Sequence, residues 1–139
     1  MVSNKAIRQA LYQRLNVASV TTLLPNGSAG IVHGVAPAGS TFPLCVFNKQ
    51  AATTTNRMGG EAFKSHLWLV KGVCKGASAS AAEDIDKAVN DLLHFGDLSI
   101  TGADDMYLAR ESDVEYVEVS GDTQFRHVGS LYRLVVQNA

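Results

Sequence analysis

One strongly amphipathic helix, with strand-like segments on both sides of it, most constrains what this 139-residue chain can fold into. In "SAAEDIDKAVNDLLHFG", apolar residues recur on one face at helical spacing, which predicts a helix over residues 81–95. Ser80 and Glu83 match a capping box at its start. Gly96 stands where a left-handed residue would end it. This helix separates two sets of predicted strands.

The residues before this helix predict a second helix and three strands. Ile7, Leu11 and Leu15 recur every four residues, which indicates a helix over residues 4–16. The strand-like segments that follow are "GIVHGVAPAG", "FPLCVFNKQ" and "EAFKSHLWLVKGVCKG". The last two are apolar on both faces, which is typical of strands in the middle of a sheet.

The residues after the helix predict about three more strands. "LSITGAD", "MYLARESD" and "EYVEVSGDTQF" alternate partially between apolar and polar residues, and a long strand follows them. In that last strand Tyr132, Leu134 and Val136 share one face, so we expect them to pack under a helix. Gly129 interrupts the run and indicates a β-bulge.

The order α-β-β-β-α-β-β-β predicts an α+β fold, with a mainly antiparallel sheet and both α-helices packed on one face. Residues 1–139 show no internal repeat or linker, so we expect a single domain. No apolar run approaches the roughly 20 residues of a membrane helix, and no signal peptide is evident.

The charges of the chain are divided unequally along its length. Residues 1–80 contain eight basic residues and one acid, a net charge of +7, whereas residues 81–139 contain four basic residues and twelve acids, a net charge of −8. One interpretation is that the halves interleave in one sheet and their charges meet within each monomer. The other is a monomer with a positive and a negative side, which favours head-to-tail contacts between copies.

The sequence contains no recognisable catalytic or cofactor-binding motif. The phosphate-loop, dinucleotide and nucleophile-elbow spacings are absent. The histidines and Cys45 and Cys74 lack the short spacings of metal ligands, and both cysteines lie in apolar runs. The overall charge of −1 argues against specific nucleic-acid recognition. We therefore expect no enzyme activity, no cofactor and no metal.

Residues 51–60, "AATTTNRMGG", predict a polar connector between two apolar strands. This segment is longer than the usual hairpin loop, and it is open whether it is an idle hairpin tip or a contact segment. Arg126 and Arg133 of the last strand are expected to meet acids on a neighbouring strand or subunit. The candidate contact residues are Thr53, Thr54, Thr55, Asn56, Arg57, Met58, Arg126 and Arg133.

Several stretches, in this order, resemble the tail-completion or tail-terminator proteins of long-tailed bacteriophages, also called head–tail joining or minor tail proteins. They are "AIRQALYQRL", "VTTLLPNG", "GIVHGVAPAGSTFPLCVFN", a strand with a tryptophan, "SAAEDIDKAVNDLL" and "FRHVGSLYRLVVQ". The resemblance spans nearly the whole chain, and its specificity lies in the order and spacing of the pieces.

The resemblance implies a structural virion protein without catalytic residues. Such a protein forms a ring, typically a hexamer, at the head-proximal end of the tail tube, stops tube polymerisation and provides the head–tail joining surface. Its partners would be further copies of itself, the tail-tube protein and the head connector, and DNA would pass through the lumen. It would reside in the virion tail, and in the host cytoplasm during assembly. The alternative from a different class is a small cytosolic α+β enzyme or ligand-binding domain.

Overall fold

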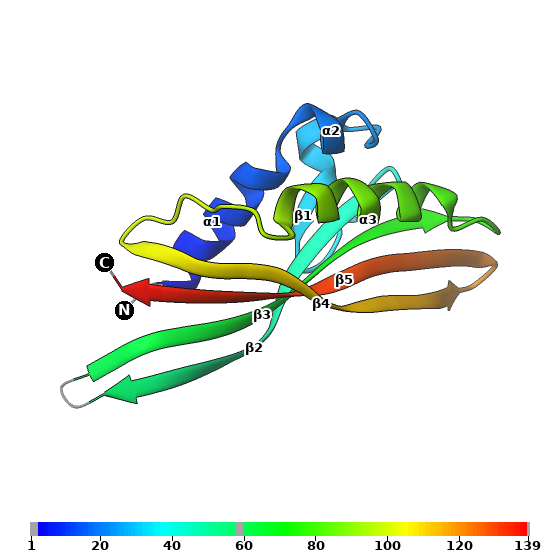
Figure 1. The fold of residues 1–139 in the computed structure, drawn as a ribbon. Coiled ribbons are helices and arrows are strands. Elements are labelled where there is room, and N and C mark those ends of the chain that lie inside the picture. Colours follow the sequence, from blue (N-terminus) through cyan, green and yellow to red (C-terminus); the bar gives the residue numbers. More distant parts are fainter. Residues whose placement is uncertain (1–2, 58–59, 139) are drawn as a thin grey trace.

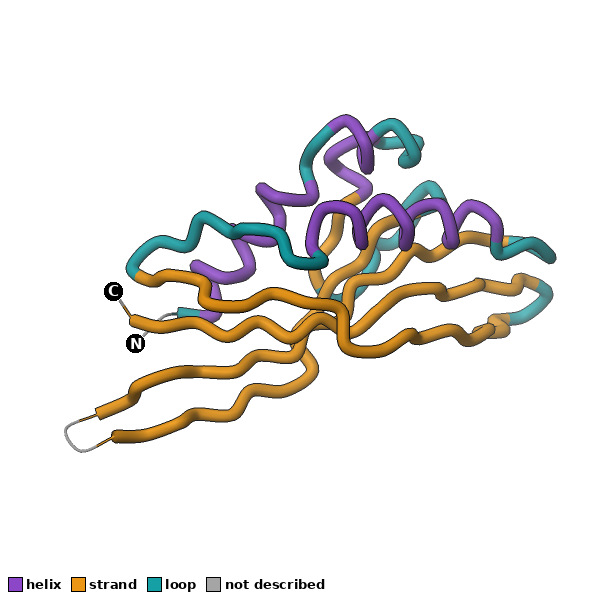
Figure 2. Tube along the Cα trace, viewed as in Figure 1, coloured by secondary structure: helices purple, strands orange, loops and turns teal. Residues whose placement is uncertain are grey.

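A five-stranded sheet carries the helices on one of its faces (Figures 1 and 2). The computed structural model describes residues 3–57 and 60–138. The strands are β1 (Ile31–His33), β2 (Leu44–Arg57), β3 (Gly60–Lys75), β4 (Ala103–Ser120) and β5 (Thr123–Asn138). The helices are α1 (Asn4–Leu15), α2 (Ala18–Thr21), the 3₁₀ helix η1 (Gly27–Gly30) and α3 (Ser80–Leu93). None of the described helices is long and apolar enough to cross a membrane.

The α+β fold class is confirmed, and the strand order across the sheet is β1-β2-β3-β5-β4. All pairings are antiparallel except that of β1 with β2, which is parallel. The sheet therefore consists of two long hairpins, β2–β3 and β4–β5, which lie side by side through the pairing of β3 with β5, and of the short strand β1 next to β2. The helix over residues 4–16 is confirmed as α1, and the Ser3 side chain accepts a hydrogen bond from the Ala6 amide at 3.1 Å.

The large core lies between the sheet and α1 and α3, and it confirms the predicted face of the last strand. Tyr132, Leu134 and Val136 are buried in this core together with Ile7 and Leu11 of α1 and with α3. On the opposite, helix-free face, a smaller apolar cluster forms around three buried strand residues. These are Leu44, Val46 and Val73, against which Ala36 and Phe42 of the loop after β1 pack.

The prediction of about three strands after α3 is wrong, because the described chain there forms two. β4 is one 18-residue strand that runs through the polar stretch "ARESD". Register shifts between Asp105 and Tyr107, and between Arg110 and Ser112, change which side chains face the core. These bulges interrupt the alternation of apolar and polar residues without ending the strand. The sequence of this one strand therefore has the pattern of several short strands.

The predicted connector over residues 51–60 is also wrong, since β2 continues to Arg57 and β3 begins at Gly60. Ala51, Ala52, Thr53 and Thr54 are all exposed, so neither face of β2 is covered there. A strand that is exposed on both faces needs no apolar alternation, and the sequence pattern is therefore missing.

Both ends of α3 differ from the prediction, which placed the N-cap at Ser80 and the left-handed terminal residue at Gly96. Ser80 is the first helical residue rather than the cap, and the N-cap Ala79 makes no side-chain hydrogen bond. Instead the Ser78 hydroxyl accepts a hydrogen bond from the Ser80 amide at 3.2 Å. At the other end Phe95, not Gly96, adopts positive φ, at 56°. Gly96 is needed for space, because a Cβ there would lie 2.1 Å from the carbonyl oxygen of residue 92.

The predicted bulge at Gly129 is wrong as well. The register of β5 with both of its neighbours is continuous through this residue. A Cβ at Gly129 would lie 2.4 Å from the Cβ of Lys71 and 2.5 Å from the Val70 carbonyl oxygen. The glycine therefore allows β3 and β5 to approach closely. Besides a bulge, such a close approach of two backbones is a common reason for a glycine inside a strand.

Candidate assembly surfaces

The two hairpins carry opposite charge, so the sheet is electrically polarised from one edge to the other. Residues 44–75, which form β2 and β3, contain five basic residues and one acid, a net charge of +4. Residues 103–138, which form β4 and β5, contain three basic residues and seven acids, a net charge of −4. Since the hairpins lie side by side in the sheet, the division along the sequence becomes a division in space.

The charges of the two halves of the chain are not neutralised by pairing with each other. Arg110 pairs with Asp86 and Asp113, and Arg133 pairs with Glu111. His127 lies beside Glu118. All of these partners belong to residues 81–139, and within the described part of the chain no ion pair links them to residues 1–80. The fold thus favours the monomer with two unlike sides over the interleaved interpretation.

The two candidate arginines of β5 have different surroundings. Arg133 donates to both oxygens of Glu111 on β4, at 2.9 and 3.2 Å, and to the Ser65 hydroxyl at 3.2 Å. It thus meets an acid on a neighbouring strand, as expected. Arg126 donates to the Gly76 carbonyl oxygen at 3.0 Å and to the Gln124 side chain at 3.2 Å. Its described partners are therefore neutral.

The remaining candidates lie at the end of β2, away from Arg126. Thr53 and Thr54 are exposed, and residues 55–57 continue the same strand. Met58 lies outside the described residues. In the register of the sheet, Thr53 pairs with Ser65, which Arg133 contacts, whereas Arg126 pairs with Cys74 near the other end of β3. The structure thus groups Thr53 with Arg133 and leaves Arg126 apart.

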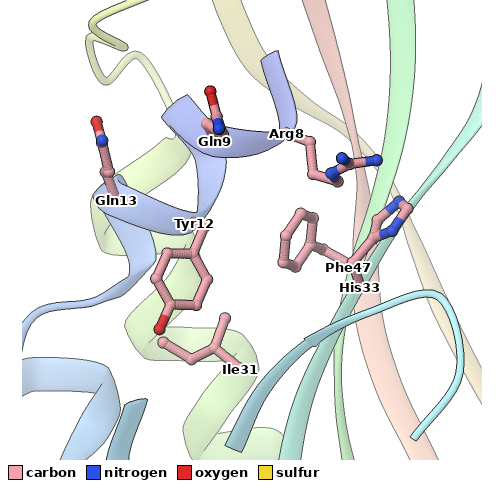
Figure 3. Close-up of a pocket in the computed structure, with 7 residues that line it drawn as sticks. All are labelled: Arg8, Gln9, Tyr12, Gln13, Ile31, His33 and Phe47. Atoms are coloured by element: carbon pink, nitrogen blue, oxygen red, sulfur yellow. The ribbon is translucent and has the colours of Figure 1, made fainter. Parts of the chain in front are cut away.

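A groove of about 430 Å³ separates α1 from β1 and β2 (Figure 3). Arg8, Gln9, Tyr12 and Gln13 line it from α1, and Ile31, His33 and Phe47 line it from the strands. The Tyr12 hydroxyl donates to the Ser28 carbonyl oxygen at 3.3 Å, and the His33 ring lies 5.4 Å from that of Phe47. The described lining contains neither a carboxylate nor a thiol, and its titratable side chains are those of Arg8, Tyr12 and His33.

A second hollow of about 450 Å³ lies on the helix-free face and contains a chain of titratable groups that sequence reasoning missed. Lys71 donates to the Tyr116 hydroxyl at 2.7 Å, and the Tyr116 ring stacks on His127 at 4.3 Å. His127 Nε2 lies 3.0 Å from a Glu118 oxygen. Burial lowers the pKa of His127, and the hydrogen bond with Glu118 opposes this shift. Cross-strand register alone brings these residues together, so their spacing in the sequence carried no signal.

The cysteines are buried and unpaired, as expected from their apolar surroundings. Burial raises the pKa of the Cys45 thiol to about 12, which keeps it protonated and unreactive at neutral pH. The Cys74 thiol donates to the Ser78 carbonyl oxygen at 3.3 Å. No cluster of three or more potential metal ligands occurs among the described residues.

Comparison with known proteins identifies the fold. Neither a protein-family model nor a curated protein matches the sequence. Among solved structures, the chain is similar to a protein chain in the virion of a native gene transfer agent (GTA) particle, with a TM-score of 0.79. The two are 17% identical, and the match covers 96% of each chain. At this identity the likeness establishes a shared fold over almost the entire length.

Proposed function

We propose that this protein is a structural subunit of a phage-type virion, and that it forms a ring at the head-proximal end of the tail tube. The ring stops tube polymerisation and provides the surface for joining the head. Its partners are further copies of itself, in a hexamer, the tail-tube protein and the head connector. The subunit acts by occupying its place in the assembly and catalyses no reaction.

The observation that carries this proposal is the polarised sheet, with a basic hairpin on one side and an acidic hairpin on the other. A ring needs two different, complementary sides on every copy, because each copy meets one neighbour with each side. Unlike charges attract the matching sides of neighbouring copies, and like charges keep two basic or two acidic sides apart. The fold shared with a chain of a virion particle supports the same role.

Assembly is tested by size-exclusion chromatography with light scattering, over a range of protein and salt concentrations. We expect a closed oligomer at low salt, which dissociates as salt rises because the exposed charges are screened within about 10 Å at 0.1 M ionic strength. The chain is also mixed with tail tubes and imaged by electron microscopy, where rings at one end of the tubes are expected. Monomers at every concentration, together with bare tube ends, would refute the proposed function.

A further inference from the structure

We propose that copies of this chain join by strand addition, with the free edge of β2 in one copy paired to the outer edge of β4 in the next. This inference rests on the proposed ring and specifies its interface. The partner is therefore a second copy of the same chain, and the two edges of the sheet are the contact surfaces. Three properties of these edges support it: open backbone, complementary charge and unsuitability for self-pairing.

The outer edge of β2 is open over residues 48–57. The parallel pairing with β1 covers only Cys45, Val46 and Phe47, and it closes with a hydrogen bond from the Gly34 amide to the Phe47 carbonyl oxygen at 3.0 Å. Beyond that point no other strand of the described chain lies on this side of β2. Ten residues in extended conformation offer about 33 Å of backbone donors and acceptors. The segment "NKQAATTTNR" contains no proline and no acid. Register shifts with β3 occur between Lys49 and Ala51 and between Thr55 and Asn56, which leaves the intervening residues 51–55 as its regular part.

β4 is the last strand of the sheet, and its outer edge is open beyond Arg110, where no other strand of the described chain lies on this side. Before that point the loop after α3 covers the edge, because the Phe95 amide donates to the Leu108 carbonyl oxygen at 2.8 Å and the Arg110 amide donates to His94 Nδ1 at 3.0 Å. The second half of β4 is exposed on both faces, and the Val117 and Val119 side chains are 48% and 66% exposed. Four exposed acids lie along residues 111–118, namely Glu111, Asp113, Glu115 and Glu118. A long edge strand with exposed valines is a template for pairing with another chain, and these acids restrict which chain can pair.

Of the three possible pairings between the two edges, their charges favour only the pairing of β2 with β4. β4 contains six acids and one basic residue, whereas residues 48–57 of β2 contain two basic residues and no acid. Pairing β4 with β4 would place acids opposite acids, and pairing β2 with β2 would bring two basic edges together, both of which are unfavourable. Pairing β2 with β4 brings opposite charges together. Such a contact is heterologous, so it continues from copy to copy until it closes into a ring.

Charge-swap variants test the pairing on the full-length chain. The first, Thr53→Glu with Thr54→Glu, adds two negative charges to the exposed edge of β2. The second, Glu115→Lys, changes the charge of the β4 edge by +2. We expect each variant alone to raise the dissociation constant of the oligomer at least about tenfold, because the net charge of residues 48–57 falls from +2 to 0 in the first and that of β4 changes from −5 to −3 in the second, which weakens the attraction between the edges. In the combined variant the introduced carboxylates on β2 attract the introduced ammonium group on β4, and we expect assembly to recover in part.

Matched controls carry the same changes of charge on the exposed surface of α3. Lys87→Glu changes the charge by −2 and Glu83→Lys by +2, and both should assemble as the wild type does. Circular dichroism and thermal unfolding verify that every variant is folded. If both edge variants assemble normally while the wild type forms rings, the strand-addition interface is wrong and the ring function stands. Failure of the combined variant to recover, or equal losses in the controls, would also overturn the interface. A wild-type chain that never assembles would overturn both proposals.

Discussion

The stability of the subunit should fall as the pH is lowered, because His66 is buried without a partner. Its side chain is fully buried on the helix-covered face of β3, and neither ring nitrogen has a hydrogen-bond partner among the described residues. Burial, together with the charges of Lys49 and Lys64, lowers the pKa of His66 from 6.5 to about 4. A buried imidazole in these surroundings remains neutral at physiological pH.

The direction of the effect follows from which state binds the proton. Below pH 6.5 the unfolded chain protonates His66, whereas the folded chain remains unprotonated there until the pH approaches 4. The free energy of unfolding therefore falls as the pH drops through this window. With 1.36 kcal/mol per pKa unit, the loss is about 2 kcal/mol between pH 6.5 and 5, and about 3 kcal/mol in full. His127, whose pKa is also lowered by burial, adds to the loss in the same direction.

Urea unfolding of the dissociated subunit at several pH values between 7.5 and 5 measures this effect. His66→Leu should remove about one bound proton from the difference between the unfolded and folded states, and thus flatten the dependence on pH. Lys49→Gln should weaken it partially, because one of the charges that lowers the His66 pKa is removed. His33→Gln is the control, since that ring is exposed and should contribute much less. The same dependence on pH in His66→Leu and in the wild type would refute the reasoning.

Three further predictions concern the packing and charges of β5. Gly129→Ala should lower the free energy of unfolding by about 2 kcal/mol or more, because the added Cβ meets the backbone of β3; no loss in urea unfolding would contradict this close approach. Leu134→Ala should cost about 3 kcal/mol, since the side chain is fully buried in the main core, and an unchanged thermal midpoint would show that the core is assigned wrongly. Arg133→Ala should cost about 1 kcal/mol or less, because its pair with Glu111 is partly exposed; a loss of several kcal/mol would mean that the pair is far stronger than solvent screening allows.

The elements that sequence reasoning predicted well are those with one buried face. In α1 and α3, and in the Tyr132, Leu134 and Val136 face of β5, burial on one side imposes the periodicity that identifies the element. The α+β class followed from the order of these elements. The charge division was visible in the sequence, but its arrangement in space depended on the side-by-side hairpins, which no local pattern specifies.

The elements that were missed lack a covered face or have shifted register. The end of β2 is exposed on both sides at Thr53 and Thr54, so it has the composition of a loop and the backbone of a strand. β4 changes phase at two bulges and therefore resembles several segments. The contact of Tyr116 with His127 arises from the pairing of β4 with β5, which is fixed by those same bulges and by the turn between the strands.

The central claim is that unlike edges of one sheet bind head to tail. Native mass spectrometry of the purified chain at low ionic strength tests it most directly, because it counts the copies in each species. We expect one discrete species of more than two copies, which gives way to monomer as ionic strength increases. A population of monomers alone, or of dimers that persist at high ionic strength, would contradict the claim.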